Sequence, residues 1–145
     1  MIKIIYGSKG TGKTKRIIDA ANSSISKELG DIVFITDTSR YIREIKYQIR
    51  FTNTKECKIA SEDGLIGFIQ GMLEANYDIR LFFIDGAARM IGKPVSEMNS
   101  FFERLKGISH KTEATFVLTI SADYDELPPF IKELTEPEEI PAAKE

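Results

Sequence analysis

The sequence predicts an α/β fold with three layers, in which helices cover both faces of a mostly parallel sheet of four to five strands. Short β-rich apolar runs alternate along the chain with segments whose apolar residues recur every three or four positions. The apolar runs are also continuous, which is typical of parallel strands that are covered on both faces. Ligands of such sheets bind beyond the carboxyl ends of the strands, so we expect the functional residues just after Tyr6, Ile35, Ile84 and Ile120.

The first half of the chain predicts two strands and two helices. The strands are Ile2–Tyr6 and Asp31–Asp37. Between them, apolar residues at spacing four predict a helix that continues to Leu29 and stops at Gly30. A shorter helical stripe follows, made by Tyr41, Ile42, Ile45 and Ile49. Residues 58–60 form either a brief strand or a loop.

The second half predicts two longer helices, two strands and a final helical turn. Ser61 is the expected N-cap of a helix that carries a stripe of small residues, Gly64, Gly67, Gly71 and Ala75, and this stripe predicts a close approach to a neighbouring element. The strands are Leu81–Asp85 and Thr115–Ser121, and they flank a helix with apolar residues from Val95 to Ile108. Two prolines then introduce a turn of helix at Phe130–Leu134.

Length and composition indicate one globular domain, residues 1–135, followed by an acidic, flexible tail, residues 136–145. The net charge of −2 gives no general attraction to nucleic acid or to an anionic membrane, and there is no clear nucleic-acid signal. No apolar stretch approaches the roughly 18 residues of a membrane span. A single cysteine and the lack of signal-peptide features favour a cytoplasmic location.

Residues 7–14, GSKGTGKT, match the pattern G-x-x-x-x-G-K-[ST] between a predicted strand and a predicted helix. The glycines let successive backbone N–H groups point at phosphate oxygens, and the start of the helix adds partial positive charge. Lys13 can reach the β- and γ-phosphates, and the Thr14 hydroxyl can bind Mg²⁺. The predicted nucleotide-binding residues are Gly7, Ser8, Lys9, Gly10, Thr11, Gly12, Lys13, Thr14 and Lys15.

Asp85 follows four apolar residues at the end of its predicted strand. A carboxylate at this place can hold Mg²⁺ opposite Thr14, often through the water molecules of the ion. The alternative is an ordinary turn at a strand end. The predicted metal ligands are therefore Thr14 and Asp85.

With these two motifs, residues 1 to about 123 resemble a P-loop NTPase, in which the loop is the Walker A motif and the strand that ends at Asp85 is the Walker B motif. More narrowly, the chain resembles a group of small, uncharacterised bacterial P-loop ATP-binding proteins, some of them labelled twitching-motility ATPases. The resemblance implies nucleotide binding with Mg²⁺ on Gly7, Gly12, Lys13, Thr14 and Asp85.

Two features favour ATP over GTP. Common GTPases carry D-x-x-G after the third strand, whereas Asp85 is followed by Gly86, Ala87 and Ala88. They also carry N-K-x-D, and residues 119–123, TISAD, do not match it. Partition-type ATPases have a signature lysine where this chain has Ser8, so we set that class aside.

The catalytic groups are less clear from the sequence. Many ATPases place a glutamate directly after the Walker B aspartate, but here that residue is Gly86. Asp37 is the best candidate base, which could orient water or accept a proton from a substrate hydroxyl. Alternatively, Asp37 caps a following helix. Ser121, or Thr119, could sense the γ-phosphate, or could simply end its strand.

Arg89 and Lys93 are predicted to lie in a loop after Asp85. This loop could close over phosphate, with Arg89 supplying the positive charge that a transition state needs, or it could meet a protein partner. Ordinary solvated surface charge is the alternative.

Three functions remain open from the sequence. The first is a Mg²⁺-dependent ATP-binding protein that hydrolyses ATP weakly, or on stimulation by a partner, and acts as a nucleotide switch. The second is a small-molecule or nucleotide kinase with Asp37 as base, although the chain has no arginine-rich lid. The third is a non-catalytic nucleotide-binding module that contacts another protein through the loop after Asp85.

Overall fold

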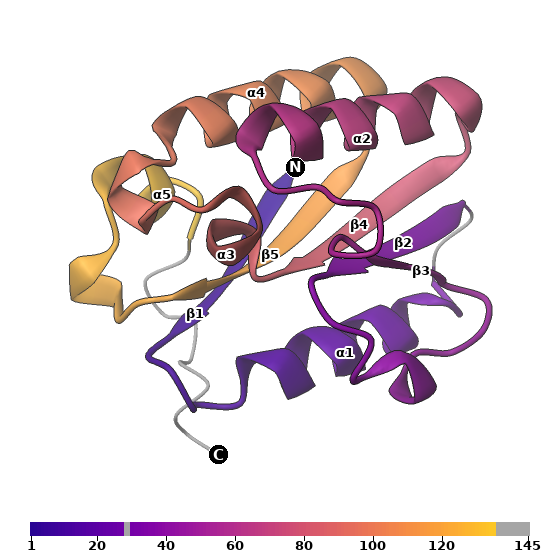
Figure 1. The fold of residues 1–145 in the computed structure, drawn as a ribbon, viewed down its shortest axis with the longest axis horizontal. Coiled ribbons are helices and arrows are strands. Elements are labelled where there is room, and N and C mark those ends of the chain that lie inside the picture. Colours follow the sequence, from indigo (N-terminus) through magenta and orange to yellow (C-terminus); the bar gives the residue numbers. More distant parts are fainter. Residues whose placement is uncertain (28–29, 136–145) are drawn as a thin grey trace.

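The computed structural model describes residues 1–27 and 30–135, which form a five-stranded, all-parallel sheet in the order β1-β5-β4-β2-β3 (Figure 1). The strands are β1 (Ile2–Gly7), β2 (Asp31–Thr36), β3 (Arg50–Asn53), β4 (Ile79–Asp85) and β5 (Thr115–Ser121). The α-helices are α1 (Lys13–Ser24), α2 (Glu62–Ala75), α3 (Ala87–Ile91), α4 (Asn99–Thr112) and α5 (Pro129–Lys132). Three 3₁₀ turns, η1 (Ile42–Glu44), η2 (Val95–Glu97) and η3 (Tyr124–Glu126), complete the described elements. The predicted three-layer architecture with a parallel sheet is confirmed.

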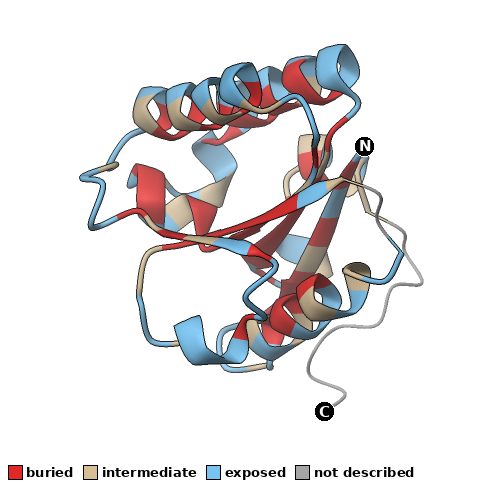
Figure 2. Cartoon of the chain, turned by 90° about the vertical axis from the view of Figure 1, so that its right-hand side faces the viewer, coloured by how far each residue is buried: buried red, intermediate tan, exposed pale blue. Residues whose placement is uncertain are grey.

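Helices cover both faces of the sheet, with α2 and α4 on one side and α1 on the other (Figure 1). Each face has its own hydrophobic core. The larger core joins alternate strand residues such as Ile4, Phe82 and Leu118 to α2, α3 and α4. The smaller core joins Phe34 and Phe83 to α1. Because both faces are covered, the strands are buried along most of their length, which explains their continuous apolar sequence (Figure 2).

The helix expected over residues 41–49 is wrong. This stretch contains only the short turn η1, and the chain continues into a fifth strand, β3, that the sequence did not indicate. Ile45 and Ile49 are both buried in the smaller core. They are four positions apart because the segment crosses the face of the sheet that α1 covers, and not because it forms a helix. In β3, Phe51 is flanked by Arg50, Thr52 and Asn53, and a half-polar edge strand of this kind gives little hydrophobic signal. Residues 58–60, left open as strand or loop, contain no strand.

Two helix details also differ from expectation. Helix α1 ends at Ser24, earlier than predicted, and Leu29 lies outside the described residues. Ser61 does cap α2, since its Oγ accepts a hydrogen bond from the Gly64 N–H at 3.0 Å. The close approach predicted from the small-residue stripe does not occur at Gly67 or Gly71, where an added side chain would meet open space; at Gly64 an added Cβ would lie 3.6 Å from the Ile59 side chain.

The parallel order places the carboxyl ends of all five strands along one edge of the sheet. The segment after β4, expected as a loop, begins with the short helix α3, and Arg89 lies on that helix. No helix in the described residues is both long and apolar enough to cross a membrane. The acidic tail predicted for residues 136–145 lies outside the described residues.

Candidate functional site

The site is built around the glycine-rich loop between β1 and α1. Gly10 and Gly12 have φ angles of +82° and +84°, in the left-handed region that favours glycine. Gly12 precedes the first residue of α1 and has no side chain to cap the helix. The first N–H groups of α1 therefore open toward the loop, as an anion-binding helix start requires.

Lys13, the first residue of α1, lies across this loop. Its side chain is almost fully buried, with 8% of the residue exposed, and its Nζ donates a hydrogen bond to the Ser8 carbonyl oxygen at 2.9 Å. The Thr11 hydroxyl donates to the same carbonyl at 2.6 Å. Burial lowers the pKa of Lys13, while the charge of Asp85 acts to raise it. Lys13 is thus held inside the loop by one neutral carbonyl, a partner that a negative ligand can replace.

Oxygen atoms from three separate elements meet beside Lys13. The Thr14 hydroxyl on α1 donates to Asp85 Oδ2 at 3.1 Å, and the Thr119 hydroxyl on β5 donates to Asp85 Oδ1 at 2.7 Å. The backbone N–H of Gly86 donates to the Thr119 hydroxyl oxygen at 3.1 Å. Asp85 is buried, so these bonds fix its orientation, and its Oδ2 faces the Thr14 hydroxyl.

Arg89 and Asp37 form a two-pronged ion pair at the same edge. Arg89 Nε and Nη2 donate to the two carboxylate oxygens of Asp37, each at 3.0 Å. This hydrogen bonding holds the pKa of Asp37 below its ordinary value and raises the pKa of Arg89. A carboxylate with a lowered pKa has a weak affinity for protons, which weighs against Asp37 as a general base in this arrangement. No helix begins at Asp37, so it does not cap one.

Gly86, at the position where many ATPases have a glutamate, lies directly under Arg89. Its φ of +95° is left-handed, and a Cβ added there would lie 2.2 Å from Arg89 Nη2. Any side chain at this position would displace the guanidinium group from its present place.

A cavity of about 170 Å³ joins these groups, and we call it the loop cavity. It is lined by Lys9, Gly10, Gly12, Lys13, Thr14, Asp85, Arg89, Thr119 and Ser121. Most of the residues singled out from the sequence therefore come together. Gly7, Ser8 and Thr11 do not line it. Lys15 does not either, because its exposed side chain pairs with Asp19 at 3.1 Å, and Asp37 reaches the cavity only through Arg89. In the described residues, no group of three or more His, Cys, Asp or Glu side chains could hold a metal ion.

A second polar cluster lies on the other side of α3, and the sequence analysis did not identify it. Glu62, at the start of α2, is buried and accepts hydrogen bonds from Lys93 at 3.1 Å, Ser100 at 2.7 Å and Arg104 at 3.0 Å. Arg104 also pairs with the exposed Asp63 at 2.7 Å. The only sequence signal is the acidic first turn of α2, which reads equally well as ordinary helix-dipole stabilisation.

No known protein-family model matches this chain, and no curated protein is significantly similar to it.

Proposed function

We propose that the chain is a Mg²⁺-dependent ATP-binding protein of the P-loop NTPase type, which hydrolyses ATP slowly, or on stimulation by a partner, and acts as a nucleotide switch. One observation carries the proposal. A buried lysine lies at the start of a helix, next to a hydroxyl and a carboxylate oxygen that are 3.1 Å apart although their residues are 71 positions apart in the sequence. The helix start and the lysine ammonium attract phosphate oxygens, and a hard divalent cation prefers the hydroxyl and carboxylate oxygens as ligands.

The donor set fits magnesium. Mg²⁺ prefers oxygen ligands, keeps several water molecules, and binds through one or two protein groups together with substrate phosphates. Thr14 and Asp85 supply such a pair of oxygens. The bound ion would neutralise charge that develops on the phosphates.

The size of the loop cavity supports binding of the phosphate end of a nucleotide. Pockets that enclose an entire small ligand have volumes of about 300–1,000 Å³. At about 170 Å³, the loop cavity suits phosphates and leaves the nucleoside outside it. ATP rather than GTP remains the expectation from the sequence motifs.

Slow turnover is expected because of what surrounds Asp85. Gly86 rather than a glutamate follows it, and Arg89, one of the two cations besides Lys13 that line the cavity, is engaged by Asp37. The low pKa of Asp37 gives the kinase alternative no support from this geometry.

Calorimetric titration with ATP, ADP, GTP and GDP, with Mg²⁺ and with a chelator, tests the proposal. We expect ATP to bind best and only with Mg²⁺, and Lys13→Ala to weaken binding by about 30-fold or more, since truncating a buried charged partner costs about 2 kcal/mol or more. Lys111→Ala, an exposed lysine on α4, serves as the matched control. Equal ATP affinity in the two variants would exclude this binding site.

Phosphate release then separates the three functions. Slow release that Lys13→Ala abolishes supports the ATPase. Tight ATP retention without release, even in cell extract, favours a non-catalytic module. New phosphorylated species in a metabolite pool incubated with ATP and the protein would favour the kinase.

A further inference from the structure

The charge of the molecule is concentrated in one segment, residues 40–58, which we call the basic segment. It carries six cationic side chains, Arg40, Arg43, Lys46, Arg50, Lys55 and Lys58, and only two carboxylates, Glu44 and Glu56. Its formal charge of +4, in a chain with a net charge of −2, leaves −6 for all other residues. The overall charge therefore hides a strongly basic region.

None of these six cations pairs with a carboxylate in the described residues. All six residues are exposed, and none forms an ion pair with a residue in the described ranges. The Arg40 guanidinium lies 5.7 Å from the centre of the Tyr41 ring. By contrast, Arg89, Lys93 and Arg104 elsewhere in the chain each pair with a carboxylate. Unpaired like charges in one segment repel each other, so an anionic partner would relieve a cost that the free protein carries.

The basic segment includes the edge strand β3 and the chain on either side of it. It leaves the carboxyl end of β2, crosses the face that α1 covers, runs along β3 at the outer edge and continues toward α2 (Figure 1). Two hollows border β3. The first, about 490 Å³, is lined by Tyr47, Gln48 and Arg50 over Ile32 and Val33. The second, about 360 Å³, is lined by Arg50, Phe51 and Asn53 among others.

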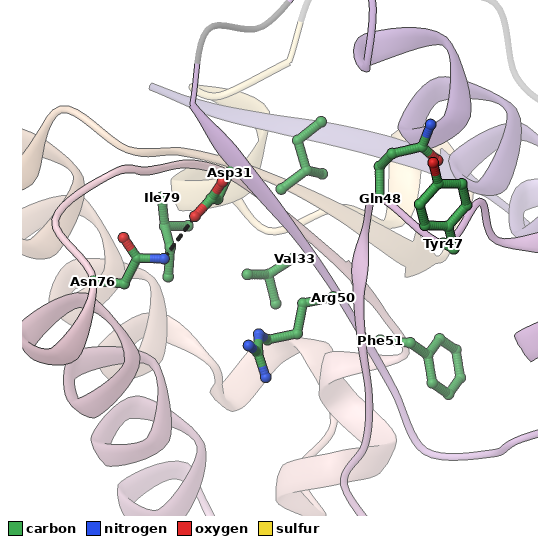
Figure 3. A pocket seen from close by; sticks show the side chains of 9 residues that line it. Asp31, Val33, Tyr47, Gln48, Arg50, Phe51, Asn76 and Ile79 are labelled. Carbon is green, nitrogen blue, oxygen red and sulfur yellow. Dashed lines mark hydrogen bonds between the residues drawn. The ribbon is translucent and has the colours of Figure 1, made fainter.

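Side chains project from both sides of this edge (Figure 3). Arg50 points to one side of β3, while Phe51 and Tyr47 lie on the other (Figure 3). Tyr47 is 92% exposed, which leaves its ring face open to a partner. One carboxylate, Asp31, also lines the first hollow, where it accepts a hydrogen bond from Asn76 Nδ2 at 2.7 Å.

We propose that the basic segment and the edge strand β3 bind single-stranded nucleic acid, with the cations contacting phosphates and Tyr47 stacking on a base. Unpaired cations together with an exposed aromatic ring, here that of Tyr47, are the combination that sequence-independent single-strand binding uses. Binding of an acidic peptide as an added strand fits less well. The strand β3 offers only four residues for backbone pairing, and such pairing makes no use of an exposed aromatic ring.

Two residues of the basic segment act on the charges of the Asp37–Arg89 pair. Lys55 contributes to lowering the pKa of Asp37, and Tyr41 contributes to raising that of Arg89, each as a smaller effect than the Asp37–Arg89 hydrogen bonds. Both residues therefore act electrostatically on the Asp37–Arg89 pair. The nucleic-acid proposal does not depend on nucleotide binding and can be tested without it.

Fluorescence anisotropy with labelled oligothymidine and oligouridine of about 20 nucleotides tests the proposal over about 50 to 200 mM salt. We expect binding that weakens steeply with salt. Lys46→Ala/Arg50→Ala should reduce the slope of log affinity against log salt by about 1.4 and the affinity at about 0.1 M salt by about 25-fold, because each single-strand phosphate contact contributes about 0.7 to the slope. Lys106→Ala/Lys111→Ala, with the same loss of charge on α4, should bind like the wild type.

Tyr47 separates stacking from charge. Tyr47→Ala should weaken binding by about fivefold or more without changing the salt slope, and Tyr47→Phe should restore it. Three results would overturn the proposal: no binding, equal loss in the α4 control, or polyglutamate competing as well as oligothymidine at equal charge. The last result would assign the surface to an acidic polypeptide.

Discussion

The segment that follows β4 is attached to the fold on two sides, and the two attachments differ in kind. On one side Arg89 pairs with Asp37, and their side chains are 57% and 14% exposed. On the other side Lys93 pairs with Glu62, whose side chain is 9% exposed and has two further donors, Ser100 and Arg104. The first attachment is a single ion pair near water, whereas the second is a buried carboxylate that accepts hydrogen bonds from three side chains.

This difference indicates what each cluster can do. Removing the partners of Glu62 leaves a charge stranded in the protein, which is costly, so this cluster anchors the segment. Arg89 can leave Asp37 at low cost because water can replace both partners. Since Arg89 lines the loop cavity, its release from Asp37 would let it turn toward a phosphate in that cavity.

Replacing Arg89 and Arg104 in turn should give the largest difference between the two attachments. If the proposed ATPase activity is present, Arg89→Ala should lower phosphate release at saturating Mg²⁺-ATP by about tenfold to 10³-fold, because an arginine can neutralise transition-state charge. Arg104→Ala should leave the rate unchanged and lower the free energy of unfolding by about 1–3 kcal/mol, because it removes one of the donors to the buried Glu62 carboxylate. Equal rate losses in the two variants would contradict separate roles.

Replacing the two carboxylates compares the clusters through stability. Glu62→Gln should lower the free energy of unfolding by about 2 kcal/mol, because charge-assisted hydrogen bonds to a buried group are lost. Asp37→Asn should lower it by less than about 1 kcal/mol, since its pair is near water. Urea denaturation followed by circular dichroism measures both values, and an equal or reversed order would remove the distinction between anchor and movable pair.

Acid sharpens the same contrast. Burial acts to raise the pKa of Glu62, but the hydrogen bonds from Ser100, Arg104 and Lys93 outweigh it, so the pKa lies below its ordinary value of 4.5. A carboxyl group with a lowered pKa stabilises the fold above its ordinary pKa, and this stability is lost as the pH falls through the lowered value.

Wild-type stability should therefore decrease as the pH falls below about 4.5, and Glu62→Gln should flatten part of that decrease. Urea midpoints measured between about pH 6 and 3 give both curves. Asp37, whose pKa is also lowered, should contribute in the same direction, so Asp37→Asn is the matched comparison. Parallel curves for Glu62→Gln and the wild type would show that Glu62 does not contribute.

The smallest expected effect concerns nucleotide affinity. Asp37→Asn should raise the affinity for Mg²⁺-ATP relative to Mg²⁺-ADP by up to about fivefold, because Arg89 is released from a pair worth about 1 kcal/mol at most. Asp125→Asn, an exposed aspartate in η3, is the control. If Lys13→Ala abolishes binding while Asp37→Asn leaves the ratio of ATP affinity to ADP affinity unchanged, the proposed nucleotide binding is supported. The idea that Arg89 leaves Asp37 for a phosphate is then contradicted.

Much of this architecture could be predicted from local patterns. A few neighbouring residues were enough to predict each of several features: the strands β1, β2, β4 and β5, the Ser61 cap of α2 and the glycine-rich loop. Strand β3 and the short helix α3 escaped prediction, because four half-polar residues and a five-residue helix carry too little periodic signal. The crossing segment before β3 gave a helical spacing for a different reason, since Ile45 and Ile49 both had to reach the core under the sheet.

The α/β class, the loop with its lysine and threonine, and the position of Asp85 at a strand end all follow from short stretches of residues, because propensity and periodicity act over short distances. The three-dimensional packing was needed to show that Asp37 faces Arg89 across 52 residues, that Gly86 lies beneath that arginine, and that Glu62 contacts Lys93, Ser100 and Arg104. Such contacts depend on strand order and on which helix covers which face. Those are set by the packing of the whole chain, and a local run of residues carries no record of them.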